Sequence, residues 1–194
     1  MRIGVDLDNT IVCYDGVFTL LAAEAGLPDA VSQRGKLHIR DFLRRQDREE
    51  EWTVMQGRAY GDRMADAVPF AGALDVLGAA KAGGHELFVV SHRTKRPYLG
   101  ESVDLHASAR DWLNRREVEQ LAEVFLEETA ESKAQRIHSL ACDVFIDDLP
   151  EFLRRPDFPA SARRLHFCPG GPAEGAEFET VESWAAVGEM LLGK

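Results

Sequence analysis

The chain has 194 residues and is 45% hydrophobic, which suits one globular domain or a core domain that carries a modest insertion. Its formal net charge of −10 disfavours nucleic acid or an anionic membrane surface as the main partner. The apolar runs are too short to span a membrane, and three widely spaced cysteines favour a reducing cytosol over disulfides or a zinc site, so we expect a cytoplasmic protein.

Residues 3–5 predict a short buried strand, and the chain turns polar at Asp6. In a parallel sheet, ligands bind where the carboxyl ends of the strands open into a crevice. Asp6 and Asp8 would stand at that edge, with Thr10 just beyond them. One of two carboxylates at this spacing can act as a nucleophile while the other moves a proton. Taken alone, the stretch is equally compatible with a strand followed by an Asp/Asn turn.

Residues 13–68 predict a helical insertion. The apolar residues are sparse, they follow helical spacing, and nothing in the segment resembles the buried strands of a parallel sheet. We therefore expect a small all-helical cap at 13–68, inserted into a core formed by residues 1–12 and 69–194. The candidates for contacting an anionic leaving group are Arg40, Arg44, Arg45, Arg58 and Arg63. Arg58 is preferred because Gly57 and Gly61 bracket it on a predicted loop, whereas most of the others would simply solvate helix faces.

From residue 69 onwards, apolar runs alternate with helical patterns. Predicted helices cover residues 71–81, 104–116, 132–140 and 184–192. Predicted strands cover residues 87–90, 124–126, 144–146, 165–168 and 178–181, with an exposed loop at 169–176. Such alternation indicates an α/β fold, a Rossmann-like parallel sheet with helices on both faces.

Three of the predicted strands end in residues that suit phosphate chemistry. These residues are Asp6 with Asp8, Ser91, and Asp147 with Asp148. Carboxylates at one edge of a sheet repel one another unless a cation lies among them, and oxygen ligands of this kind suit Mg²⁺. Lys133 and the Ser91 hydroxyl would then hold phosphoryl oxygens. Lys95 is the alternative phosphate-binding lysine, and His92 and Arg93 follow Ser91 as candidates to line the pocket.

This ordered set resembles the four motifs of the haloacid dehalogenase superfamily, in its phosphatase branch. Its motifs are an aspartate pair followed by a threonine, a serine after an apolar strand, a lysine that opens a helix and an acidic pair that ends a strand. They correspond here to Asp6, Asp8 and Thr10, then Ser91, Lys133, and Asp147 with Asp148. The resemblance covers the core segments 1–12 and 69–194, and it implies that residues 13–68 form a cap.

The resemblance also implies roles. Asp6 would attack phosphorus and form an aspartyl-phosphate, while Asp8 would protonate the leaving oxygen and then activate water. Mg²⁺ would be held by Asp6, the backbone carbonyl of Asp8 and Asp148, with Asp147 assisting. Thr10 would orient the loop beside the phosphate-binding Ser91 and Lys133. Apart from the resemblance, the position of Arg58, His92 and Arg93 in the sequence makes them the candidates for contacting substrate. Dehalogenases of the superfamily generally lack an acid at the position of Asp8, so phosphoryl transfer is favoured.

The resulting expectation is a Mg²⁺-dependent phosphatase that acts on a small phosphorylated metabolite, such as a sugar phosphate or nucleotide. A phosphotransferase or mutase of the same superfamily would use the same motifs and pass the phosphoryl group to a second substrate. A non-enzymatic, metal-dependent phospho-acceptor or binding module is the third possibility, although a passive acceptor has no use for the proton-transfer group Asp8.

Overall fold

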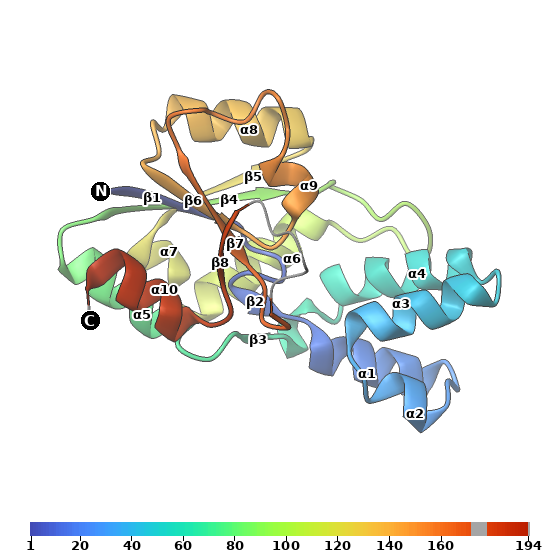
Figure 1. The fold of residues 1–194 in the computed structure, drawn as a ribbon. Helices are drawn as coiled ribbons and strands as arrows, with labels where there is room; N and C mark the ends of the chain where they lie inside the picture. Colours follow the sequence, from blue (N-terminus) through green and yellow to red (C-terminus); the bar gives the residue numbers. More distant parts are fainter. Residues whose placement is uncertain (172–177, 194) are drawn as a thin grey trace. The chain divides into compact units, whose positions relative to one another are not determined.

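A computed structural model describes residues 1–171 and 178–193 of the chain (Figure 1). Most of the loop predicted at 169–176 lies outside the described residues. The chain forms two compact units. The core unit contains Met1–Val12, Pro69–Arg93 and Glu117–Lys194, and the insertion unit contains Cys13–Val68 and Thr94–Arg116.

The core unit is built on a six-stranded sheet in the order β5-β4-β1-β6-β7-β8, and all neighbouring strands run parallel. Its strands are β1 (Arg2–Val5), β4 (Glu86–His92), β5 (Glu123–Glu127), β6 (Val144–Asp147), β7 (Arg163–Phe167) and β8 (Glu179–Val181). The predicted parallel α/β sheet is confirmed. Two short strands that the sequence did not predict, β2 (Val12–Cys13) and β3 (Val68–Pro69), pair in a separate sheet.

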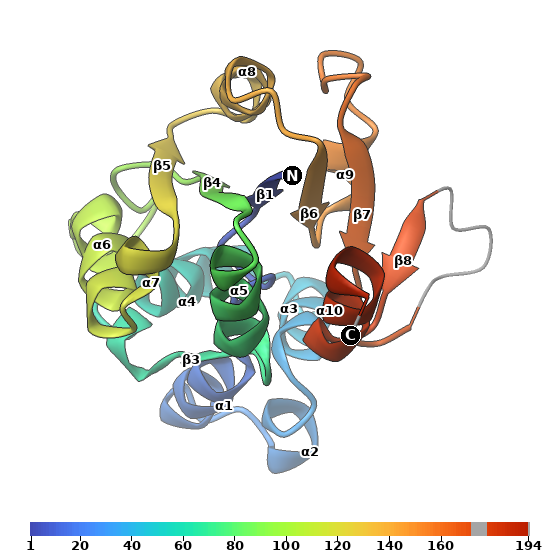
Figure 2. The same cartoon turned by 90° about the vertical axis from the view of Figure 1, so that its left-hand side faces the viewer.

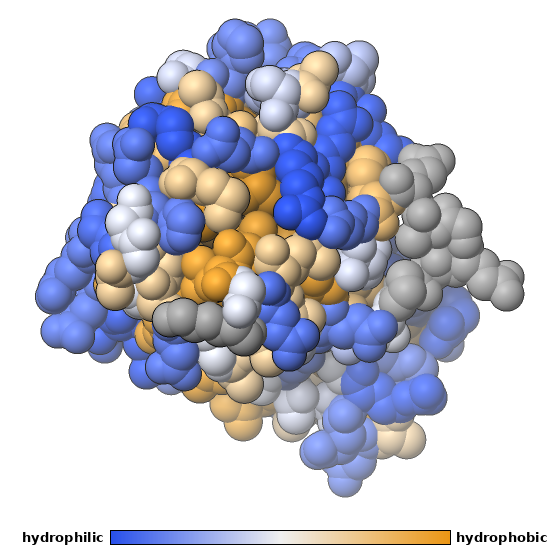
Figure 3. Space-filling view, turned by 60° about the vertical axis from the view of Figure 1, so that its left-hand side comes forward, coloured by the Kyte–Doolittle hydropathy of each residue, from blue (hydrophilic) through white to orange (hydrophobic). Residues whose placement is uncertain are grey.

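Helices cover both faces of this sheet (Figures 1 and 2). They are α5 (Ala73–Ala82), α7 (Val118–Leu121), α8 (Ala130–Ser139), α9 (Pro150–Leu153) and α10 (Trp184–Leu192). Helices α8 and α9 pack on one face, and α5, α7 and α10 pack on the other. Where α5 and α10 face the viewer in Figure 3, apolar side chains of both helices and of the strands beneath them gather around a small hollow.

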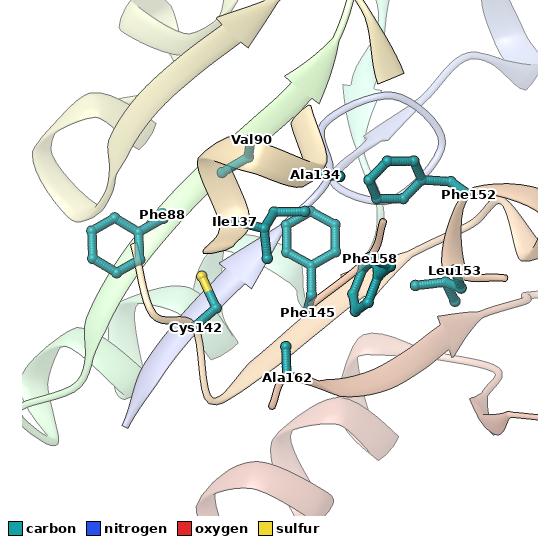
Figure 4. Packing of buried hydrophobic residues seen from close by; sticks show 10 residues of the cluster. All are labelled: Phe88, Val90, Ala134, Ile137, Cys142, Phe145, Phe152, Leu153, Phe158 and Ala162. Carbon is teal, nitrogen blue, oxygen red and sulfur yellow. The ribbon is translucent and has the colours of Figure 1, made fainter. Parts of the chain in front are cut away.

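The buried cluster under α8 and α9 explains a glycine in the first strand. Phe145 and Phe152 belong to this cluster (Figure 4), and Phe145 lies opposite Gly4 in the β1–β6 register. A Cβ atom on Gly4 would come within 2.5 Å of the Phe145 ring and 3.0 Å of the Cys142 sulfur. Gly4 therefore lets the aromatic ring pack directly against the backbone of the central strand.

The insertion unit is helical in its described residues. It contains α1 (Asp15–Glu24), α2 (Asp29–Ser32), α3 (Lys36–Arg45), α4 (Glu49–Tyr60), the 3-10 turn η1 (Met64–Asp66) and α6 (Leu105–Arg115). Phe18 stacks on the buried Trp52 at 5.1 Å between ring centroids. The indole nitrogen of Trp112 donates to the Ala67 carbonyl at 2.9 Å, which ties α6 into this unit. No helix among the residues described in either unit is long and apolar enough to cross a membrane.

We predict that Gly4→Ala destabilises the protein by about 1–3 kcal/mol, because the new methyl group overpacks a fully buried ring. For a chain of this size the melting midpoint should fall by roughly 2–4 °C per kcal/mol. Gly78→Ala is the matched control: a Cβ atom on Gly78 in α5 meets nothing within 4 Å, so the substitution should stabilise by about 0.5–1 kcal/mol. Equal thermal shifts for the two variants would contradict the packing argument.

Candidate active site

The loop after β1 presents two carboxylates from a tightly folded turn. The Ile11 amide donates to the Leu7 carbonyl at 3.0 Å, and the Asn9 amide donates to the Val12 carbonyl at 2.9 Å. Leu7 and Ile11 are fully buried and anchor the turn, while Asn9 takes a left-handed conformation (φ 59°) that asparagine tolerates well. Asp6 and Asp8 are thereby fixed on either side of a buried leucine.

Lys133 lies between two of the predicted acidic residues. Its ammonium donates to Asp6 Oδ1 and to Asp147 Oδ2, each at 2.6 Å. All three side chains are almost completely buried: the exposed fraction is 3% for Lys133, 7% for Asp6 and 0% for Asp147. Helix α8 presents the lysine from its first turn, after a capping box in which Thr129 and Ser132 satisfy each other's backbone amides. The lysine expected to hold phosphate thus contacts both the expected nucleophile and the acidic pair.

Burial and charge set the protonation of this group of side chains. Burial raises the pKa of Asp6 to about 7 in the metal-free site; Lys133 opposes this shift, and the charges of Asp147 and Asp8 add to it. Burial alone would lower the pKa of Lys133, but the charges of Asp147 and Asp6 outweigh it, so the pKa is raised and the ammonium stays protonated. The site therefore holds a permanent cation beside a carboxyl group that is poised to titrate.

Two residues at the end of β4 reach the second carboxylate. The Ser91 hydroxyl lies 3.4 Å from Asp8 Oδ2, and the guanidinium of Arg93 forms an ion pair with Asp8 Oδ1. Ser91 is fully buried and Arg93 is nearly so. Because side chains of a strand alternate, residues 91 and 93 reach towards the same side. From the sequence, Arg93 was predicted only to line the pocket, and its contact with Asp8 was missed. The signal for this contact is that Arg93 follows Ser91 by two residues, just beyond the end of the strand.

The acidic residues fit a divalent metal ion. Asp6, Asp147 and Asp148 each offer a carboxylate oxygen, and these oxygens lie within 4.8 Å of one another. Hard oxygen donors of this kind suit Mg²⁺. Asp147 is already held on both sides, since its Oδ1 accepts the Leu149 amide at 2.8 Å and its Oδ2 accepts Lys133. Asp6, of which Lys133 contacts one oxygen, is therefore better placed than Asp147 to ligate a metal directly.

The remaining predicted residues lie in different surroundings. Thr10 is fully buried; its carbonyl accepts the Trp184 indole at 2.8 Å, and its hydroxyl has no hydrogen-bond partner among the described residues. Partial burial and the charge of Lys133 lower the pKa of His92, which leaves its ring neutral near pH 7. Lys95 and Arg58 belong to the insertion unit. The loop predicted around Arg58 is wrong: Arg58 lies in the last turn of helix α4, and it pairs with Glu24 at 2.9 Å.

Comparison with known proteins identifies structures with a similar fold. No protein-family model and no curated protein matches the sequence. Solved structures do match, among them a haloacid dehalogenase superfamily hydrolase from Ehrlichia chaffeensis at 11% identity, with 99% of this chain and 96% of that chain covered and a TM-score of 0.63. A predicted phosphoglycolate phosphatase from Haemophilus somnus matches at 15% identity, with 97% and 96% covered and a TM-score of 0.61.

A hydrolase of the same superfamily from Deinococcus radiodurans, solved with bound phosphate and sodium, matches at 17% identity, with 99% and 95% covered and a TM-score of 0.57. The coverage is nearly complete on both sides in all three matches, so the similarity extends over whole chains. This chain therefore has the fold of the haloacid dehalogenase superfamily, as its motifs predicted.

The raised pKa of Asp6 predicts how stability changes with pH in a chelator. Folded Asp6 keeps its proton at a pH where the unfolded carboxyl group, near 3.8, has lost it, so its contribution to stability is present below pH 4 and is lost as pH rises through about 7. The side chain of Asp6→Asn cannot titrate. The difference in stability between this variant and the wild type should therefore shift in favour of the variant as pH rises from 5 to 8. Melting curves of both proteins across this range measure the difference. A difference that does not change with pH would contradict the raised pKa.

Proposed function

We propose that the protein is a Mg²⁺-dependent phosphatase that hydrolyses a small phosphomonoester through an aspartyl-phosphate on Asp6. The observation that carries this proposal is the ammonium of Lys133, 2.6 Å from Asp6, next to a second carboxylate, Asp8, which Ser91 and Arg93 contact. A nucleophile, a proton-transfer group and donors for phosphoryl oxygens are the parts that such a reaction needs.

In the first half of the cycle, a carboxylate oxygen of Asp6 attacks phosphorus and the ester bond to the leaving oxygen breaks. Asp8 gives that oxygen a proton, so that it departs as an alcohol. Lys133 and the Ser91 hydroxyl donate to the phosphoryl oxygens, where negative charge is concentrated. In the second half, Asp8 takes a proton from water, which attacks the aspartyl-phosphate and releases inorganic phosphate.

Mg²⁺, held by Asp6, the backbone carbonyl of Asp8 and Asp148, would supply positive charge that offsets the repulsion between carboxylate and phosphate. Asp147 would assist this group by fixing Lys133, because both of its oxygens already accept hydrogen bonds from the protein. The role of Thr10 is to keep the β1 loop in place.

The resemblance and the similar structures support the proposed substrate class. One of these is a predicted phosphoglycolate phosphatase and another was solved with phosphate, which supports a small phosphorylated metabolite, such as a sugar phosphate or nucleotide, as the substrate. Arg93 and His92 follow the strand that carries Ser91, so both are proposed to contact this substrate. The helices of the insertion unit are proposed to act as a cap, with Arg58 as the candidate to meet the leaving group, and the protein is proposed to act in the cytoplasm.

The function is tested by phosphate release from p-nitrophenyl phosphate and from a panel of phosphorylated metabolites, with Mg²⁺ and with a chelator. We predict Mg²⁺-dependent turnover in the wild type and none in Asp6→Asn, because an amide is neither a nucleophile nor an anionic metal ligand. Circular dichroism of the variant should match the wild type. Substantial residual turnover in a clean preparation of a folded variant would remove Asp6 from its role.

Asp8→Asn tests the proton transfer separately. We predict a loss of roughly 10²–10⁴-fold, the usual contribution of general acid–base catalysis. In single-turnover phosphorylation, aryl phosphates should lose less than alkyl phosphates, because a good leaving group needs little protonation. The same loss on both kinds of ester would show that Asp8 is not the acid.

A further inference from the structure

The ammonium of Lys133 has a third neighbour besides its two carboxylates. A lysine ammonium carries three N–H donors, and two of them go to Asp6 and Asp147. The ring of Phe152 lies 4.2 Å from the Lys133 nitrogen, measured to the ring centroid, and the ring of Phe145 lies at 5.3 Å. Both distances fall within the range of about 6 Å in which an aromatic face attracts a cation.

The ring of Phe152 is held firmly where it meets the ammonium. Phe152 is 5% exposed and packs edge-on against Phe158 at 5.7 Å, in the cluster that Figure 4 shows. It lies in α9, directly after the turn in which Asp147 accepts the Leu149 amide. One short segment, from Asp147 to Phe152, therefore supplies both a carboxylate and an aromatic face to the same ammonium.

We propose that Phe152 is a positioning residue for catalysis: its aromatic face holds the Lys133 ammonium against Asp6 and Asp147. An aromatic face attracts a cation without offering a strong acceptor, so it does not draw the ammonium away from the carboxylates. The proposal rests on the phosphatase function and adds the residue that fixes its central cation. Phe152 acts through Lys133 and touches neither substrate nor reacting atoms.

The test compares Phe152→Leu with Phe158→Leu. Each substitution removes one ring from the same buried cluster, and each removes a contact between a cation and a ring, but the cation over Phe158 is Arg164, at 4.9 Å. The two variants should therefore lose similar packing, while only the first removes a ring that faces the Lys133 ammonium.

The first measurement is the ¹⁵N–¹H signal of the Lys133 ammonium in the intact, metal-free protein, assigned with Lys133→Gln. A buried, hydrogen-bonded ammonium exchanges its protons slowly with water, so the wild type and Phe158→Leu should show the signal. Phe152→Leu should broaden or lose it. The second measurement is turnover of p-nitrophenyl phosphate: we expect kcat of Phe152→Leu to fall roughly two- to thirty-fold, with a smaller change in KM, whereas Phe158→Leu keeps kcat.

Two results would overturn the proposal: an unchanged ammonium signal and kcat in Phe152→Leu, or equal losses in both variants, which would reduce Phe152 to a packing residue. If Phe152→Leu does not fold, Phe152→Met fills the space with a flexible apolar chain and is judged by the same comparison. If the wild type hydrolyses no phosphomonoester, the proposed function fails, and the ammonium signal alone decides whether Phe152 positions Lys133.

Discussion

The buried ammonium of Lys133 is the interaction on which the rest of the core unit depends. It joins the ends of β1 and β6 through Asp6 and Asp147, and it ties helix α8 to both strands. Removing one partner of a buried ion pair typically costs about 3–5 kcal/mol, because it leaves an uncompensated charge away from water. The same contact also fixes Asp6, the proposed nucleophile, so the requirements of stability and of the proposed chemistry meet at one ammonium group.

Charge balance at the site bears on how an acidic chain could bind the anionic substrate proposed for it. Four carboxylates gather at the site, from Asp6, Asp8, Asp147 and Asp148, and two cations, Lys133 and Arg93, contact three of them. In the fully ionised state the carboxylates exceed the two cations by two negative charges, and the proton that the proposed mechanism places on Asp8 reduces this excess to one. A divalent metal ion would offset the excess, so the proposed phosphomonoester would not meet the formal net charge of −10 at the site.

The sequence predicted the parallel sheet and the side chains that lie at its edge because both depend on local patterns. The apolar runs at residues 3–5, 87–90 and 144–146 can be recognised in the sequence, and each is followed by a polar residue. Contacts between distant segments left weaker signals or none: the two-residue spacing of Ser91 and Arg93 indicates that both reach towards one side, but it does not identify Asp8 as the partner. The pairing of Arg93 with Asp8 and the position of Phe152 beside Lys133 depend on how a loop turns after its strand. The membership of residues 94–116 in the insertion unit depends on a long-range contact, from Trp112 to Ala67.

The strand order explains why these particular strand ends meet. Strands β4 and β5 are added on one side of β1. The chain then crosses back over the sheet, and β6, β7 and β8 are added on the other side of β1. The connections after β1 and β6 therefore start on opposite sides of the point where the strand order reverses, which is where ligands bind in open parallel sheets. Helix α8 is the crossing element, because it connects β5 to β6 and packs over β4 and β5. A basic residue in its first turn, Lys133, therefore reaches the one place in the sheet where carboxylates from β1 and β6 lie side by side.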